Sequence, residues 1–307
     1  MKVDEFATHL RGVLAFVPTP FAADGTVDRK HLVRQITRLA DDGSVSAVVV
    51  AGGVGEYYAL DIDDYRDLIE AALEAASGLP VIVGTASSTR ASTAVAAAAR
   101  DLGAAGLMVN PLAFVASTPE QLLRHYGAVF EASGLGMIAF STSAQRLDLH
   151  TLHHLCEAVP GVVAFKDEVG DLGAFLSVRR ELGSRLMLVN GMAEPLARVY
   201  AAAGADAMTS GIANALPRLV VALWSAATSG DRRRVEEIET ALTPLLELRS
   251  RVPGHQTAVL KAAIADAVDP DFPVEVRLPL RPLCSDERTE LTAALDVARR
   301  EQDRGSA

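Results

Sequence analysis

The sequence predicts a (β/α)8 barrel, and three observations support this. Short runs rich in aliphatic and β-branched residues recur along the chain, and helix-like segments follow them. The runs are apolar without alternation, as at Ala47–Val50, which is typical of parallel strands buried on both faces. No break in composition divides the repeated units, so a closed barrel is favoured over an open doubly wound sheet.

The predicted strands and helices alternate in chain order. An Asp24-Gly25 turn follows the first strand, and Asp42-Gly43 ends the first helix. Eight strands with helices between them are what a barrel of this kind requires. The predicted strands are residues 13–17, 47–51, 81–85, 106–110, 137–141, 162–166, 186–190 and 207–210. The predicted helices include residues 29–42, 63–77, 120–133 and 194–203.

The chain beyond Gly230 is predicted to be helical only. Helical patterns cover residues 231–251, 255–268 and 286–300, and a connector that contains four prolines separates the last two. We therefore expect residues 1–230 to form the barrel. Residues 231–307 are expected to form a C-terminal helical extension that packs on the barrel as part of one structural unit.

The composition indicates a globular protein without a charged binding surface. Half of the 307 residues are hydrophobic, and the formal net charge of −10 comes with no basic run, which argues against nucleic acid and anionic membranes as partners. Two cysteines, Cys156 and Cys284, predict no disulfide framework. We find no signal sequence and no run of ~18 apolar residues, so we expect a cytoplasmic protein without a membrane span.

Lys166 is the leading candidate for a catalytic residue. It ends an apolar predicted strand, and it is one of only four lysines among 29 basic residues. Arginine keeps its proton in proteins, whereas a desolvated lysine can lose it and attack a carbonyl carbon to form an imine. The alternative is a lysine at a strand end whose ammonium group pairs with Asp167, Glu168 or Asp171.

In a (β/α)8 barrel the reacting groups lie at the carboxyl ends of the strands. Apart from Lys166, these ends carry hydroxyls, amides and glycines, with neither a histidine nor a pair of carboxylates. Zinc-dependent hydrolysis and glycoside hydrolysis therefore lack the residues that they need, and we expect no metal ion and no cofactor. His150, His153 and His154 belong to a predicted helix away from this rim.

Two segments at the same rim have the residues of an anion site. Successive backbone N–H groups of Gly52-Gly53-Val54-Gly55 could cradle a carboxylate or phosphate, although a tight turn from strand to helix also explains the glycines. Ser210-Gly211 opens a helix after the last strand, where barrels often bind phosphate. No Lys or Arg stands in that second segment, which weakens a phosphate interpretation.

Several motifs together resemble one family of barrels that form Schiff bases. They are Pro18-Thr19-Pro20-Phe21, Gly53-Val54-Gly55-Glu56, Phe165-Lys166-Asp167, Ser210-Gly211-Ile212-Ala213-Asn214 and Val276-Arg277-Leu278-Pro279-Leu280. With them the chain resembles the dihydrodipicolinate synthase / N-acetylneuraminate lyase family over residues 11–284. Within that family, the segments around Gly53 and Lys166 and the Leu248-Arg249-Ser250-Arg251 segment are most similar to 5-dehydro-4-deoxyglucarate dehydratases.

The resemblance implies an imine between Lys166 and a 2-oxo acid, with the substrate carboxylate held by the turn after the second strand. It also implies a homotetramer that needs no cofactor and no metal. The residues implied at the substrate site are Thr19, Gly53, Val54, Gly55, Ser141, Ser143, Gly191, Thr209, Ser210 and Gly211.

The chain departs from the family pattern in the predicted pocket. The tyrosine that shuttles protons in the family aligns with Phe140, and the threonine that binds the carboxylate aligns with Val54. Tyrosines are also common in the family where this chain reads Leu112-Ala113-Phe114. A drier pocket should lower the pKa of Lys166, whereas losing an acid–base group removes a contribution of about 10²–10⁴-fold. Ser141, Ser143, Ser210 or a water molecule are candidates to replace the tyrosine.

The predicted function is that of a lyase that dehydrates a sugar acid similar to 5-dehydro-4-deoxyglucarate through an imine and an enamine. Aldol cleavage, or condensation of pyruvate with an aldehyde, is the alternative reaction of the same enamine. A barrel that binds a 2-oxo acid without turnover also remains open, and Phe140 and Val54 favour it. The third alternative is a phosphate-binding barrel without imine chemistry.

Overall fold

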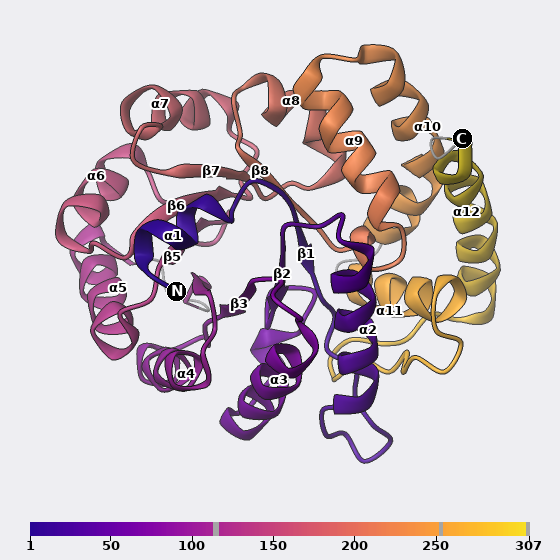
Figure 1. The fold of residues 1–307 in the computed structure, drawn as a ribbon, viewed down its shortest axis with the longest axis horizontal. Coiled ribbons are helices and arrows are strands. Elements are labelled where there is room, and N and C mark those ends of the chain that lie inside the picture. Colours follow the sequence, from indigo (N-terminus) through magenta and orange to yellow (C-terminus); the bar gives the residue numbers. More distant parts are fainter. Residues whose placement is uncertain (113–116, 252–253, 305–307) are drawn as a thin grey trace.

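The computed structural model describes residues 1–112, 117–251 and 254–304, and eight parallel strands close a barrel in chain order (Figure 1). The first and last strands pair, with Leu14 opposite Thr209. The predicted (β/α)8 barrel is therefore confirmed, and the open-sheet alternative is wrong. The strands are β1 (Gly12–Phe16), β2 (Ala47–Val50), β3 (Val81–Gly84), β4 (Gly106–Val109), β5 (Met137–Ser141), β6 (Val162–Asp167), β7 (Met187–Asn190) and β8 (Ala207–Ser210).

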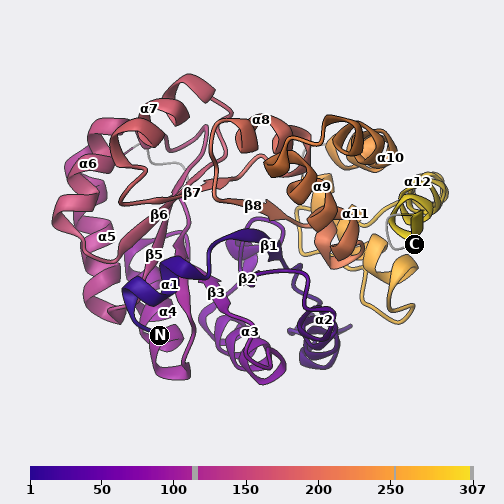
Figure 2. The same ribbon diagram turned by 45° about the horizontal axis from the view of Figure 1, so that its top comes forward.

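A ring of helices surrounds the strands (Figures 1 and 2). Polar residues begin most of these helices, because the carboxylate or hydroxyl of an N-cap residue accepts a backbone N–H that the helix leaves unpaired. Asp28 does so before α2, Ser88 before α4 and Asp148 before α6. The helices are α2 (Arg29–Asp42), α3 (Ile62–Ala75), α4 (Thr89–Leu102), α5 (Pro119–Ser133), α6 (Leu149–Ala158), α7 (Leu172–Leu182), α8 (Ala197–Ala202) and α9 (Pro217–Ser229).

A short helix, α1 (Val3–Thr8), closes the amino end of the barrel. Its Phe6 is fully buried and belongs to the apolar cluster that fills the barrel interior. A Cβ atom added at Gly106, the first residue of β4, or at Gly136, just before β5, would lie 2.4 Å from the Phe6 side chain, so both positions need glycine. Since Phe6 occupies the amino end, a ligand must enter at the carboxyl end of the strands.

Three helices follow the barrel and pack against its side near α9 (Figure 2). They are α10 (Arg232–Ser250), α11 (His255–Ala267) and α12 (Ser285–Arg304). Helix α11 is buried on nearly every face, and the side chain of its Lys261 is fully buried. The C-terminal helices therefore contribute buried side chains as well as an outer layer.

Short 3-10 turns follow three of the strands at the carboxyl end of the barrel. They are η1 (Tyr57–Ala59) after β2, η2 (Glu194–Leu196) after β7 and η3 (Ile212–Asn214) after β8. The helix expected over residues 194–203 is thus divided, because a 3-10 turn containing Pro195 precedes α8. These turns place side chains directly over the barrel mouth.

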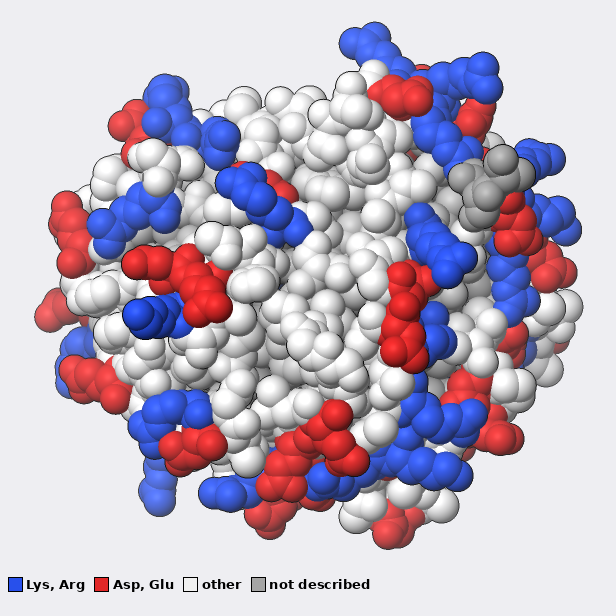
Figure 3. All heavy atoms as spheres, viewed as in Figure 1, with Lys and Arg blue, Asp and Glu red and all other residues white. Residues whose placement is uncertain are grey.

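The surface carries charges of both signs. On the face shown in Figure 3, Lys and Arg side chains alternate with Asp and Glu around the edge, while uncharged side chains occupy the centre. None of the described helices has the length and apolar character needed to span a bilayer.

Candidate active site

A cavity of about 340 Å³ opens at the carboxyl end of the barrel, within the size range of small-molecule sites. Lys166, from the end of β6, reaches it. Most of the other lining residues come from strand ends and the turns that follow, and two come from the C-terminal extension. The described lining residues are Phe16, Gly53, Val54, Tyr57, Pro111, Phe140, Thr142, Lys166, Glu168, Gly191, Met192, Ala193, Thr209, Ser210, Gly211, Arg249 and Gln256.

The Lys166 side chain is 3% exposed and lies between aromatic rings and one carboxylate. Its Nζ atom is 3.5 Å from the centre of the Phe140 ring and 5.1 Å from that of Phe16. The same nitrogen donates a hydrogen bond to Oε2 of Glu168 at 2.5 Å. The amine is thus held in one place at the cavity wall, with an acceptor for its proton beside it.

Burial lowers the pKa of Lys166, because an ammonium ion loses its hydration among apolar rings. The negative charge of Glu168 acts in the opposite direction and raises that pKa. Desolvation is the larger of the two effects. Lys166 therefore combines both arrangements that the sequence suggests: it pairs with a carboxylate, and its amine loses its proton more easily than that of an exposed lysine.

The turn after β2 is held in shape by its own backbone and by Thr19. Gly53 and Val54 face the cavity, whereas a Cβ atom at Gly55 would lie 3.1 Å from the backbone nitrogens of Ala51 and Gly52. The Thr19 hydroxyl is fully buried and donates to the Gly55 carbonyl at 2.7 Å. Thr19 and Gly55 therefore support the turn from behind and do not line the cavity.

Glu56 ends this turn and anchors it to the C-terminal extension. Its carboxylate is fully buried and lies 2.6 Å from Nζ of Lys261 on α11. The backbone N–H of Arg277 donates to the other carboxylate oxygen at 2.8 Å, and Lys261 also donates to the Glu275 carbonyl at 2.6 Å. Burial lowers the pKa of Lys261, while Glu56 raises it. The extension thereby fixes the segment that carries Gly53.

A second buried ion pair lies at the carboxyl ends of β7 and β8. Glu194 accepts a hydrogen bond from the Ser210 hydroxyl, and Nη1 of Arg249 lies 3.2 Å from the other Glu194 oxygen. The side chain of Glu194 is fully buried and that of Arg249 is 14% exposed. Helix α10 therefore brings a cation to Ser210 that the local sequence lacks, and Glu194 neutralises it. The buried carboxylate of Glu194 next to Ser210 disfavours a phosphate site there, because two negative charges would lie close together away from water.

Comparisons with known proteins agree with this geometry. The model of the Dihydrodipicolinate synthetase family matches residues 9–298. The chain belongs to this family. It is 32% identical over 290 residues to the 5-dehydro-4-deoxyglucarate dehydratase of Pseudomonas putida, covering 92% of this chain and 94% of that protein. Its membership of this family and its similarity to a dehydratase identify the chain as a lyase.

Solved structures share the fold. Dihydrodipicolinate synthase from Bacillus clausii superposes with a TM-score of 0.86 at 24% identity, over 95% of this chain and 99% of that one. The wild-type sialic acid aldolase of Ruminococcus gnavus gives a TM-score of 0.89 at 18% identity, over 96% and 99% of the two chains. At these identities the likeness concerns the barrel itself.

The predicted substrate residues of this dihydrodipicolinate synthetase family member divide into two groups. Gly53, Val54, Phe140, Lys166, Gly191, Thr209, Ser210 and Gly211 line the cavity, whereas Thr19, Gly55, Ser141 and Ser143 do not. The Ser141 hydroxyl is buried and accepts the backbone N–H of Leu147 at 2.9 Å, and Ser143 is exposed away from the cavity. Thr142, which lies between them, is the hydroxyl residue of this segment that reaches the cavity.

Several residues that line the cavity were not among the predicted site residues. Glu168 carried a usable signal, because it lies two positions after Lys166 just beyond the end of a strand. Arg249 belongs to the segment that resembles the dehydratases, but neither it nor Gln256 was assigned to the site, since they come from α10 and α11, far from the strand ends in the chain. Ala113 and Phe114 of the loop after β4 lie outside the described residues.

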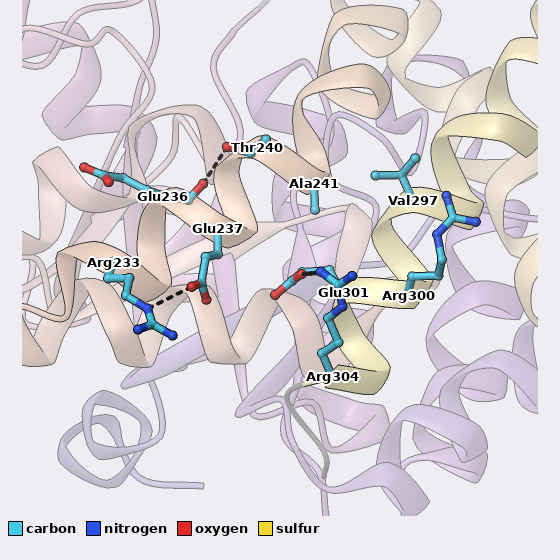
Figure 4. Close-up of a pocket in the computed structure, with 9 residues that line it drawn as sticks. All are labelled: Arg233, Glu236, Glu237, Thr240, Ala241, Val297, Arg300, Glu301 and Arg304. Atoms are coloured by element: carbon cyan, nitrogen blue, oxygen red, sulfur yellow. Dashed lines mark hydrogen bonds and ion pairs between the residues drawn. The ribbon is translucent and has the colours of Figure 1, made fainter.

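Neither the histidines nor a second groove changes this assignment. His150, His153 and His154 lie on α6, and no group of three or more His, Cys, Asp or Glu among the described residues could hold a metal ion. A groove of about 550 Å³ between α10 and α12 is lined by charged side chains such as Arg233 and Glu237, which pair with each other at 2.9 Å (Figure 4). None of the described residues that line this groove is a lysine, so the cavity at Lys166 is the candidate active site.

Proposed function

We propose that this lyase forms an imine between Lys166 and a 2-oxo acid and dehydrates a sugar acid similar to 5-dehydro-4-deoxyglucarate. The observation that carries the proposal is the buried amine of Lys166 at the end of β6, in a cavity of small-molecule size. The name of the Pseudomonas putida relative supports the choice of reaction.

In the proposed reaction the neutral amine of Lys166 adds to the C2 carbonyl of the acid, and loss of water gives the imine. The protonated imine withdraws electrons, so a proton can leave C3 and the C–H electron pair forms an enamine. The enamine nitrogen returns its electron pair and expels the C4 hydroxyl, which leaves as water after protonation. Hydrolysis of the remaining imine then consumes one water molecule, releases the product and restores the Lys166 amine. Because imine formation also released one water, the net change is the loss of one water molecule from the substrate.

We assign the binding of the substrate to the walls of the cavity. Backbone N–H groups at Gly53 and Val54 would hold the carboxylate next to the reacting carbonyl. The hydroxyls of Thr142 and Thr209 and the amide of Gln256 would hold the hydroxyls and the far carboxylate of the sugar acid. We assign no role at the substrate to Ser141 and Ser143, which do not line the cavity.

Two alternatives keep the same site. Condensation or aldol cleavage uses the same enamine with an aldehyde in place of the departing hydroxyl. A barrel that binds a 2-oxo acid without turnover is favoured by the absence of a hydroxyl at Phe140 and Val54. We further propose that the protein is a cytoplasmic homotetramer, as the family resemblance implies. In each chain, residues 1–230 and 231–307 would fold as one unit, and the ion pair between Glu56 and Lys261 supports this.

The test is to measure the consumption of 5-dehydro-4-deoxyglucarate and, separately, of pyruvate with and without aspartate semialdehyde. We expect the sugar acid to be consumed without any aldehyde, and Lys166→Arg to abolish this because arginine keeps its proton. Lys30→Arg, on α2, is the matched control. Turnover that occurs only when the aldehyde is present would exclude the dehydratase in favour of a condensing enzyme.

A further inference from the structure

The described cavity wall contains a single carboxyl group, that of Glu168. It follows Lys166 by two positions, just beyond the end of β6, and its backbone N–H donates to the Ser141 carbonyl at 2.9 Å. Its Oε2 atom lies 2.5 Å from Nζ of Lys166, and the side chain is 45% exposed. The carboxylate thus touches the reacting nitrogen on one side and opens to the cavity on the other.

The other polar side chains on this wall are less suited to carry protons. The Arg249 guanidinium keeps its proton and pairs with Glu194. The Thr142 and Thr209 hydroxyls do not titrate near neutral pH. Burial and the charge of Glu168 raise the pKa of the Tyr57 phenol, which makes it a poorer acid. Phe140, whose ring lies against Nζ of Lys166, has no hydroxyl.

We propose that Glu168 is the catalytic acid–base residue at Lys166 and supplies the proton transfers for which Phe140 has no hydroxyl. This inference rests on the proposed imine chemistry of the same site. It assigns to one residue the transfers at the nitrogen, at C3 and at the departing oxygen.

The transfers balance over one cycle. The Glu168 carboxylate takes a proton from the Lys166 ammonium, and the free amine adds to the C2 carbonyl. After a proton moves from nitrogen to oxygen, the Glu168 carboxylic acid protonates the hydroxyl at C2, which leaves as water when the iminium forms. The regenerated carboxylate then takes the C3 proton to give the enamine. It returns this proton to the C4 hydroxyl, which leaves as the second water. One water molecule then hydrolyses the iminium, which releases the product and restores the Lys166 ammonium and the Glu168 carboxylate.

A purely electrostatic role for Glu168 predicts the opposite result. Its charge raises the pKa of Lys166, so removing the charge increases the fraction of free amine near neutral pH. If Glu168 only holds the ammonium ion, Glu168→Gln should form the imine faster and exchange the C3 protons at least as fast. If Glu168 carries the protons, C3 exchange should fall by about 10²–10⁴-fold, the range of general acid–base catalysis.

The experiment uses pyruvate in deuterated water, and NMR follows deuterium entry into its methyl group, which is C3. Borohydride trapping on the same samples reports imine formation at Lys166 independently. The variants are Glu168→Gln, Glu168→Ala with and without formate, Tyr57→Phe, and the matched control Glu181→Gln on α7. Circular dichroism checks folding, and the partial exposure of Glu168 makes its substitution compatible with the fold.

We expect Glu168→Gln to be trapped by borohydride yet to exchange about 10²–10⁴-fold more slowly than the wild type. Formate should restore part of the exchange in Glu168→Ala. Wild-type exchange in Glu168→Gln, or its loss only in Tyr57→Phe, would overturn the assignment to Glu168. Failure of the wild type to be trapped at all would overturn the imine chemistry itself, and the assignment with it.

Discussion

The buried pair of Glu56 and Lys261 predicts that the C-terminal extension stabilises the active-site turn. Lys261→Met keeps an unbranched side chain of similar length but removes the ammonium group, which contacts Glu56 at 2.6 Å and the Glu275 carbonyl at 2.6 Å. Both side chains of the pair are 0% exposed, so Glu56 would be left as a buried charge without its cation. Removing one partner of a buried pair costs about 3–5 kcal/mol in the free energy of unfolding.

The assay is urea unfolding of the wild type and three variants, followed by circular dichroism. Lys261→Met should lose about 3–5 kcal/mol, and the double variant Lys261→Met/Glu56→Gln should recover most of it because no unpaired charge remains. Arg251→Met breaks a pair with Glu290 of which both side chains are 50% exposed, and should cost at most about 1 kcal/mol. Equal losses in Lys261→Met and Arg251→Met would show that the buried Glu56–Lys261 pair contributes no more to stability than an exposed pair.

Three further predictions concern the cavity. Phe140→Tyr places a hydroxyl near the amine in nearly the same volume. In the Glu168→Gln background this substitution should raise the rate of C3 exchange by about tenfold or more. No gain would contradict the contact between Phe140 and the imine. Val54→Thr should lower the pyruvate concentration for half-maximal trapping by about tenfold, the value of one hydrogen bond to a charged group, and an unchanged value would place the carboxylate elsewhere. Because burial lowers the pKa of Lys166 from its ordinary value of 10.5, the trapping rate should rise with pH and reach its plateau below pH 10.5. In Glu168→Gln the plateau should begin at a still lower pH, since the charge that raises this pKa is gone. A plateau at or above pH 10.5 would count against a desolvated amine.

The barrel could be predicted from the sequence because its determinants are local. Strands buried on both faces, such as Ala47–Val50, read as uninterrupted apolar runs, and helix α2 has the predicted bounds because Asp28 begins it and Gly43 ends it in the left-handed region. The divided helix after β7 was missed, because the 3-10 turn at η2 depends on packing over the barrel mouth.

The site could be predicted only where a strand end determines what faces the cavity. Lys166 and Phe140 are opposite each other on β6 and β5, so both belong to the same wall. Ser141 follows Phe140 on β5, so the alternation of side chains along a strand turns it away from the cavity. Whether Thr142 or Ser143 points inward depends on how the chain leaves β5, and sequence patterns do not specify that. Residues from the extension, such as Arg249, reach the site only through the tertiary packing of helices beyond the barrel.

The proposed function depends above all on a covalent imine between Lys166 and a 2-oxo acid. The most direct measurement is reduction with borohydride in the presence of pyruvate, followed by mass spectrometric mapping of the modified peptide, with Lys166→Arg as the control. We expect one pyruvate-derived adduct on Lys166 and none in Lys166→Arg. An adduct on another lysine, or no adduct under conditions that trap an active dihydrodipicolinate synthase, would contradict it.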